Sequence, residues 1–471
     1  MVQAKSTRKR AANQSAKKNG AGTARHVRIT ADTPHVECSE RLTAFGGLLA
    51  LVKFLDLIGF EKLFGDHYLD PKREPKLGSY RMTLGILMLL FIGFQRLGQF
   101  SYIRTDAMVC GILRVPKLPA VSTFWRYLRS LTINQSGSLL KLGAALRAQV
   151  WGLCGYAPRR VTVNIDTTVS TVYGAIEGAR KGHNMKHRGK KGLRPVLCFL
   201  AETREYLCGT QRRGETMSSE EVGRQIRQFR KLLPSTVCEV RVHGDGECIG
   251  WESLKACLDN GFLFTFGKGR SAPPFPDKGW YRHDEHEYNE CVYQPLGWEQ
   301  PCRFVAMRIR ESKRGDRQLK LLEGYTYRVF ATNERARPHR VIEDYDQRAD
   351  VENLIGEAQR EGILAIPSKR FQSHHAFFQI VMLAYNLWRW MKLLAGYAQQ
   401  QAHDGREVDE RLRITMPDHT IRVARLKMLY VAAKIRFHAN RDQVCYSLHD
   451  QRAAGLIDFL DYMDARRREA A

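Results

Sequence analysis

The chain has 471 residues, 44% of them hydrophobic and 10% aromatic, a composition that excludes an intrinsically disordered protein and predicts two to four domains with ample core. The net charge of +26 favours nucleic acid as the partner, because neutralising phosphates releases counterions; a basic surface without a partner is the alternative. Eleven scattered cysteines without a C-x2-C pair argue against structural zinc and indicate reduced thiols in a cytoplasmic protein.

The first 154 residues predict a basic arm followed by helices. Residues 1–30 carry eight Lys and Arg residues and no acid, so we expect a disordered arm that contacts phosphates or only aids solubility; no apolar stretch of secretory type lies there. Residues 31–154 are expected to form a helical DNA-binding domain. Within it, the mostly apolar segment 82–95 is shorter than the roughly 20 residues of a membrane span, so it predicts a buried helix and no membrane partner.

A short helix is predicted next, in the segment 118–131. Ser122 or Thr123 is its expected cap, and Arg126 lies where a recognition helix would contact DNA. A plain core helix explains the same pattern.

Two predicted strands end in aspartates. Val161, Val163 and Ile165 alternate with polar residues, the period of a β-strand, and this strand ends at Asp166. A second alternating run ends at Asp245, which lies between two glycines; a plain turn residue is the alternative there.

The segment between these aspartates predicts a basic loop, a hairpin and a helix. The Gly-rich loop 180–194 contains no acid, and the hairpin turns near Thr203 and Arg204. The helix runs from Ser218 to Leu233, with Ser218 or Ser219 as its cap. We expect the loop to contact DNA through four cationic side chains: Lys186, Arg188, Lys190 and Lys191.

Residues 267–340 predict a β-rich insertion, because Gly, Pro and aromatic residues replace the helical pattern. His283 and His286 lie among acids and suggest a metal, but without regular spacing to further ligands a solvated loop is favoured. Trp280 and Trp298 are expected to pack, with base stacking as the alternative.

The segment Val341 to Gly362 predicts a helix with a functional face. Tyr345, Arg348, Glu352 and Gln359 recur with helical spacing. An apolar stripe for packing accompanies them: Val351, Leu354, Ile355 and Ala358. A solvated helix with an ordinary Arg348–Glu352 pair is the alternative.

Three carboxylates, those of Asp166, Asp245 and Glu352, would repel one another at one site unless cations neutralised them. Oxygen ligands suit Mg²⁺ or Mn²⁺. Two such ions about 4 Å apart stabilise the attacking and the leaving oxygen of a phosphoryl displacement.

The C-terminal part predicts a mixed region. A helix is expected over 370–394, a polar loop over 399–410, and two strands over 428–449 that are joined near residues 439–442. The end, from residue 464, is expected to fray.

The three acids and the helix around the third acid resemble a known signature. Asp166, Asp245 and Glu352, with the Tyr345-x2-Arg348-x3-Glu352 spacing around the third acid, are similar to the DDE triad and Y-R-E signature of bacterial insertion-sequence transposases. The resemblance covers most of residues 40–450, including the segment Arg370 to Leu394.

One position departs from this signature. The family carries Lys seven residues after the Glu, and this chain has Gln359, a neutral amide that cannot supply a charged phosphate contact. The DNA contact at that position is therefore weaker here or belongs to Arg360.

The resemblance implies an α/β chain with a ribonuclease-H-like catalytic core over 155–395, an insertion at about 267–340, and a C-terminal DNA-binding or assembly region over 396–471. It implies a cut-and-paste transposase of a bacterial, nucleoid-associated type that binds double-stranded DNA, namely its terminal inverted repeats and its target, as a homodimer. The three acids would hold two Mg²⁺ ions, with Arg348 orienting Glu352 or binding a phosphate and Tyr345 contacting the DNA backbone. A nuclease without strand transfer and a non-catalytic DNA-binding derivative are the alternatives.

Overall fold

The computed structural model describes residues 29–182, 187–268, 273–310, 325–403 and 419–470. The chain divides into two compact units, Met1–Glu40 and Arg41–Ala471. The described residues of the first unit, 29–40, contain turns and no helix or strand. Residues 1–28 of the predicted basic arm lie outside the described residues.

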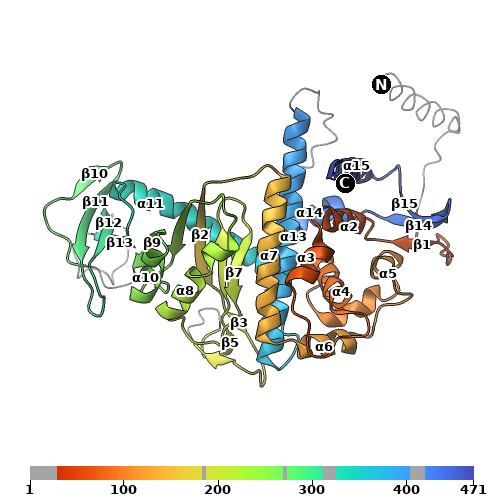
Figure 1. Ribbon diagram of the computed structural model, residues 1–471, viewed down its shortest axis with the longest axis horizontal. Coiled ribbons are helices and arrows are strands. Elements are labelled where there is room, and N and C mark those ends of the chain that lie inside the picture. Colours follow the sequence, from red (N-terminus) through yellow and green to blue (C-terminus); the bar gives the residue numbers. More distant parts are fainter. Residues whose placement is uncertain (1–28, 183–186, 269–272, 311–324, 404–418, 471) are drawn as a thin grey trace. The chain divides into compact units, whose positions relative to one another are not determined.

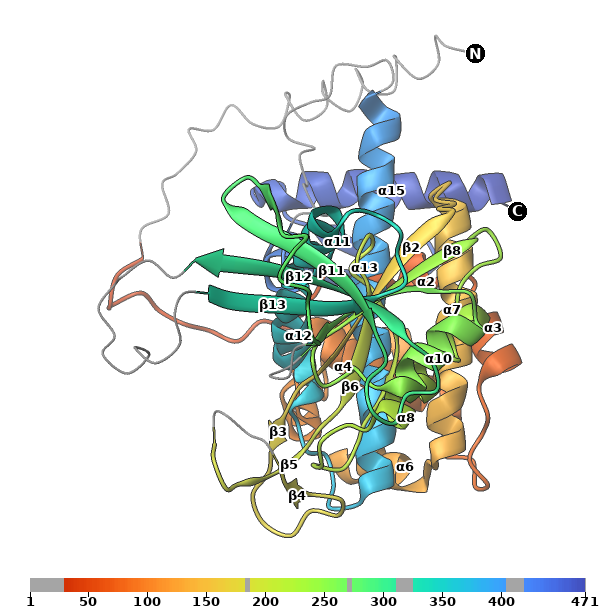
Figure 2. The same ribbon diagram turned by 90° about the vertical axis from the view of Figure 1, so that its left-hand side faces the viewer.

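A nine-stranded mixed sheet dominates the second unit (Figures 1 and 2). In spatial order the strands are β10 (Tyr281–His283), β11 (His286–Tyr293), β12 (Cys302–Arg310), β13 (Tyr325–Thr332), β9 (Leu263–Lys268), β8 (Glu239–Gly244), β2 (Arg160–Thr167), β6 (Val196–Leu200) and β7 (Tyr206–Thr210). Strands β2 and β8 follow the predicted alternation of apolar and polar residues, which places their apolar side chains on one face of the sheet.

The predicted β-rich insertion continues this sheet. Strand β13 pairs antiparallel with β9, with Phe330 opposite Gly267, so β10 to β13 extend the same sheet at one side. Strands β8 and β9 run parallel to β2, whereas β6 runs antiparallel to it. The predicted hairpin turn is confirmed at Arg204, which has φ of 58°.

Helices cover both faces of the central strands. One face packs against α12 (Asp350–Ala358) and α13 (Phe371–His403), and Leu197 and Phe199 belong to the same apolar core as these helices. The other face packs against α8 (Ser219–Ile226), α9 (Phe229–Leu232) and α10 (Trp251–Asp259). Helix α7 (Ile133–Leu153) lies beside α13 and contributes to both cores (Figure 1).

A buried carboxylate links these helices to the sheet. Glu205, which is fully buried, accepts a hydrogen bond from the Trp151 indole at 3.0 Å and another from the Trp390 indole, and its second oxygen lies 3.3 Å from Arg147 Nε. Because a charge at such a position is costly without partners, this cluster fixes α7 and α13 relative to β7.

The region predicted to be helical from Arg41 to about Leu153 is helical from Leu48, whereas Arg41–Thr43 form the short strand β1. Its helical elements are α2 (Leu48–Leu57), α3 (Phe60–His67), α4 (Ser79–Ile92), the 3-10 helix η1 (Leu97–Ile103), α5 (Ala107–Leu113), α6 (Val121–Ser130) and α7. Helix α4 is buried over nearly its whole length and packs against α13, where Phe91 stacks on Trp388 with ring centroids 4.0 Å apart. Within the described residues no single helix combines the length and apolarity of a bilayer span; α4 and η1 pass that test only as a pair bent by 82°.

The C-terminal segments form a second, smaller sheet. Strands β14 (Ala433–His438) and β15 (Arg441–Tyr446) make the predicted hairpin, and β14 also pairs with β1 (Arg41–Thr43). Helix α14 (Ile421–Ala424), the π-helical turn η5 (Arg425–Leu429) and α15 (Gln451–Ala470) flank it.

Several predicted details were wrong. Helix α6 begins at Val121, so Ser122 and Thr123 lie inside it and neither caps it. The basic stretch 180–194 is not simply a loop, because β4 (Arg180–Lys181) and β5 (Lys191–Leu193) form a small sheet with β3 (Ser170–Thr171).

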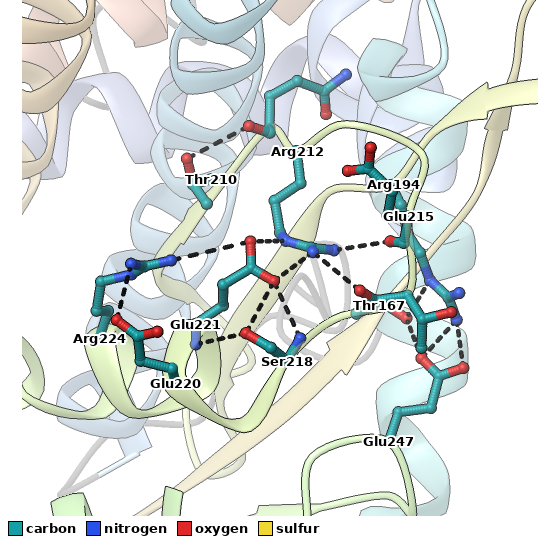
Figure 3. Close-up of polar contacts among 12 residues, drawn as sticks. Thr167, Arg194, Thr210, Arg212, Glu215, Ser218, Glu220, Glu221, Arg224 and Glu247 are labelled. Carbon is teal, nitrogen blue, oxygen red and sulfur yellow. Dashed lines mark hydrogen bonds and ion pairs between the residues drawn. The ribbon is translucent and has the colours of Figure 1, made fainter. Parts of the chain in front are cut away.

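Helix boundaries also differ from the prediction. The helix expected over 218–233 is split into α8 and α9; Ser218 does cap α8, in a capping box with Glu221 (Figure 3). The loop expected over 399–410 was wrong for its first residues, because α13 continues to His403; residues 404–410 lie outside the described part of the chain. The end that was expected to fray is helical to Ala470.

Candidate active site

Two aspartates come together where parallel strands β2 and β8 end. Ile165 is the register partner of Gly244, so Asp166 and Asp245, the next residues on each strand, lie at the same edge of the sheet. Gly244 is required there, since a Cβ would lie 2.6 Å from the Phe266 ring. The turn after β8 is held by Asp245, whose Oδ1 accepts the backbone N–H of Glu247 at 3.0 Å.

The predicted functional helix lies across these strand ends, but it is not one regular α-helix. It comprises α11 (Pro338–Asp346), a 3-10 turn η2 (Gln347–Ala349), α12, and a π-helical turn η3 (Gln359–Ile363). Changes of helix type of this kind shift the side-chain spacing from the ideal 100° per residue. The expected apolar stripe from Val351 to Ala358 is buried, as predicted.

Tyr345 and Arg348 tie this helix to both aspartate strands. The Tyr345 hydroxyl donates to the Gly244 carbonyl oxygen at 3.1 Å. Arg348 Nη2 donates to the Ile165 carbonyl oxygen at 3.0 Å and lies 3.1 Å from Asp166 Oδ2. The Arg348 side chain is 12% exposed, so this is a shielded ion pair rather than the surface pair with Glu352 that was the alternative.

The remaining residues of the helical face differ in exposure. Gln359 Nε2 donates to Thr168 Oγ1 at 2.6 Å, which ties the amide to the end of β2. Glu352 and Arg360 are exposed. No hydrogen bond or ion pair of the Glu352 carboxylate occurs within the described part of the chain, which leaves its oxygens accessible for a ligand.

Burial and neighbouring charges together shift the protonation of Asp166. Burial is the largest cause, Arg348 opposes it, and the carboxylates of Asp245 and Glu352 add to it, so that the pKa of Asp166 is raised to about 6. One guanidinium therefore does not balance three carboxylates. An all-oxygen donor set with uncompensated negative charge fits a hard divalent cation such as Mg²⁺.

Residues that the sequence prediction missed border this site. Arg194 Nη2 pairs with Glu247 at 2.5 Å, and its Nε lies 3.2 Å from Thr167 Oγ1 (Figure 3). The Thr167 hydroxyl donates in turn to Glu247 at 3.3 Å. Arg194 is 5% exposed. The signal in the sequence was a second acid two residues after Asp245, at the same strand end.

A second polar cluster includes His243, which lies on β8 two residues before Asp245. Among the described residues, one potential ligand atom from each of His243, Glu334 and Asp344 lies within 4.8 Å of the others, close enough for the three to share a metal ion. Arg241 already joins the two carboxylates, with Nη1 3.0 Å from Asp344 and Nη2 3.4 Å from Glu334. The cluster is therefore an ion-pair network that fixes α11 against β8.

Most of the predicted DNA-contacting side chains that the structure describes are exposed, whereas Gln359 is half-buried. Arg188 and Lys190 are exposed just before β5, Lys191 is exposed on β5, and Arg126 is exposed on α6, whose other face is buried. Lys186 lies outside the described residues. Of the two histidines considered for a metal, His283 packs against His339 with ring centroids 4.0 Å apart, and its Nε2 lies 3.8 Å from Asp284 and 3.9 Å from Glu343.

Comparison with known proteins identifies a family. The family model described as "Transposase DDE domain group 1" matches residues 35–447. Among solved structures, the chain is similar to one titled "Cryo-EM structure of piggyBac transposase synaptic complex with hairpin DNA (SNHP)", with 9% identity, a TM-score of 0.38, and coverage of 78% of this chain and 84% of that one. No curated protein matches the sequence.

Proposed function

The chain belongs to the transposase DDE domain group 1 family, and we propose that it is the DNA transposase of a bacterial insertion sequence, which binds terminal inverted repeats and catalyses DNA cleavage and strand transfer. The observation that carries the proposal is the junction of three elements: Asp166 and Asp245 end adjoining parallel strands, and the Tyr345-x2-Arg348-x3-Glu352 helix is bonded to both strands. A surface helix with ordinary charge pairs would not make these bonds.

We assign the roles by contact. Asp166, Asp245 and Glu352 would hold two divalent cations, Mg²⁺ or Mn²⁺. Such ions, when bound, supply charge stabilisation to the attacking and the leaving oxygen of a phosphodiester. Arg348 is a positioning residue, since it holds the Asp166 carboxylate through a short ion pair and the end of β2 through the Ile165 carbonyl. Tyr345 positions the end of β8 in the same way.

The reaction requires little covalent chemistry from the side chains. Water attacks a phosphodiester at each element end and leaves a 3′-hydroxyl, and this hydroxyl attacks a phosphodiester of the target DNA. The protein's contribution is to align these groups and to stabilise the charge that develops in each step. The rigid strand ends, held by Arg348 and Tyr345, suit that task.

We propose a ribonuclease-H-like core for this chemistry. The supporting feature is the strand order β7-β6-β2-β8-β9, with β6 antiparallel to β2 and two acids at the ends of β2 and β8. The core would span residues 155–395 with the insertion at about 267–340, between a helical DNA-binding domain over 31–154 and a DNA-binding or assembly region over 396–471.

The proposed partners are the terminal repeats and target DNA, engaged by a homodimer in the bacterial cytoplasm at the nucleoid. The net charge of +26 supports a polyanionic partner. Cationic and amide groups flanking the site would contact the backbone: Arg126, Lys186, Arg188, Lys190, Lys191, Gln359 and Arg360.

A strand-transfer assay tests the proposal. Labelled duplexes carrying each end of the element, taken from the DNA that flanks the coding sequence, are incubated with the protein, Mg²⁺ and a supercoiled plasmid. We expect nicked ends and end–plasmid joints. Cleavage without joints would identify a nuclease, and specific binding without cleavage would identify a non-catalytic derivative.

A further inference from the structure

The β14–β15 hairpin separates its charged and apolar residues by face. Register pairs Lys434 with Cys445, Arg436 with Gln443 and His438 with Arg441, so these six side chains share one face. The other face carries Ala433, Ile435, Phe437, Asp442, Val444 and Tyr446. The single acid of the two strands therefore lies opposite the cationic face.

The base of the hairpin is anchored, and its outer half is exposed. The Tyr446 hydroxyl donates to the Gly46 carbonyl oxygen at 2.9 Å, and Ala433 is buried. Residues 436–442 are all exposed. A two-residue turn closes the tip, with φ of 51° at Ala439 and 58° at Asn440, a turn whose twist matches that of the strands.

The cationic face presents groups that read bases. Arg436 and Gln443 are direct cross-strand partners, and Arg436 Nε donates to Gln443 Oε1 at 3.2 Å. Arg recognises guanine and Gln recognises adenine through paired hydrogen bonds in the major groove, whereas a surface that only binds phosphates needs no Gln. Arg441 adds a second guanidinium at the tip of this face.

The dimensions also fit the major groove of duplex DNA. Two antiparallel strands lie about 4.8 Å apart, and six residues span about 20 Å. The major groove is about 12 Å wide and 8.5 Å deep and admits a two-stranded ribbon. The minor groove, about 6 Å wide, does not admit this ribbon without deformation of the DNA.

We propose that the β14–β15 hairpin enters the major groove of duplex DNA with its Arg436–Gln443–Arg441 face toward the base edges and so reads the ends of the element. This inference rests on the proposed function, because the ends are the DNA that a transposase must recognise. It assigns sequence reading to the hairpin, apart from the carboxylate site.

Binding of full-length protein to an end duplex and to an unrelated duplex of equal length tests this assignment. We expect Arg436→Gln with Arg441→Gln to weaken end binding roughly 100-fold, at about tenfold for each arginine removed from a base, and to reduce the preference for the end. Arg436→Lys keeps the charge but loses the planar fork, so it should reduce the preference with the salt dependence unchanged. Arg282→Gln on β10, an exposed arginine in the insertion to which no DNA contact is assigned, is the matched control and should change neither.

The outcomes separate the two levels of the proposal. An unchanged preference in the double variant overturns the hairpin assignment, and so does an equal weakening on both duplexes, which would indicate phosphate contacts alone. Wild-type protein without preference for its ends would instead overturn the proposed function. A thermal unfolding temperature equal to that of the wild type would verify that each variant is folded.

Discussion

Replacing Asp166 by Asn tests, through protein stability, whether burial and the neighbouring carboxylates raise the pKa of Asp166. The pKa of Asp166 is raised from an ordinary 3.8 to about 6 in the folded protein. A carboxyl whose pKa is raised by folding stabilises the protein in its protonated form, and this contribution is lost as pH rises through the folded value. At about 1.36 kcal/mol per pKa unit, ionisation costs the metal-free wild type about 3 kcal/mol, most of it between pH 4 and pH 7.

Urea unfolding in the presence of a chelator measures this cost. The Asn variant cannot ionise, so the wild type should lose about 2 kcal/mol of unfolding free energy relative to the variant between pH 4 and pH 7. Other groups titrate in both proteins and cancel in the difference. At neutral pH, Mg²⁺ should stabilise the wild type, because a ligand that binds the folded state adds unfolding free energy, and it should stabilise the variant much less.

Two results would contradict this reasoning. Parallel stability curves for the two proteins across the pH range would mean that folding does not raise the pKa of Asp166. Equal stabilisation by Mg²⁺ would remove Asp166 from the cation site. Asp350→Asn is a suitable control, because Asp350 lies on the same helix as Glu352 and pairs with Arg204, 2.9 Å away, outside the carboxylate site.

The remaining predictions concern the groups around the carboxylates and the N-terminal arm. Arg348→Lys should lower the rate of DNA cleavage at saturating Mg²⁺ at least tenfold, because a single ammonium cannot hold both Asp166 and the Ile165 carbonyl in the planar geometry of the guanidinium. The control variant Asp350→Asn should cleave at nearly the wild-type rate. Similar rates for the two variants would exclude a positioning role for Arg348. Glu247→Gln should lower the thermal unfolding temperature, because it leaves the buried Arg194 guanidinium without its charge partner; an unchanged temperature would show that the pair is not needed for folding. Deleting residues 2–28 removes eight cationic residues and should flatten the log–log salt dependence of DNA binding by roughly 0.9 for each phosphate that the arm neutralises, and an unchanged slope would place the arm away from DNA.

Local patterns were sufficient to locate the main elements. The alternation around Val163 predicted β2, and the alternating run before Asp245 predicted β8, because one buried face requires an apolar residue at every second position. The apolar stripe at Val351 and Leu354 predicted the packed side of α12 for the corresponding reason in a helix. The period of two residues in a strand and of 3.6 residues in a helix depends only on residues that are close in the sequence.

Boundaries that depend on tertiary contacts were not predictable in the same way. The apparent cap residues of α6 lie inside the helix. Arg180–Lys181 and Lys191–Leu193, within the predicted basic loop, form strands because β4 and β5 pair with each other and β5 also pairs with β3. Similarly, the sequence predicts a β-rich insertion without indicating the strand with which it pairs, and the structure shows that β13 pairs with β9 and joins the main sheet. Pairing partners come from distant parts of the chain and leave no local periodicity.

The amino-acid pattern alone was enough to show that acids follow two strands and occupy a helix, and that Tyr345, Arg348 and Glu352 share a helical spacing. The folded chain was needed to show that β2 and β8 are parallel neighbours in register, which brings Asp166 beside Asp245 and within reach of Arg348. Spacing along a chain fixes the face on which a side chain lies, whereas the strand that adjoins that face is fixed by packing of the whole core. For that reason the helical spacing suggested an ion pair of Arg348 with Glu352, and the pair of Arg348 with Asp166 became evident only from the fold.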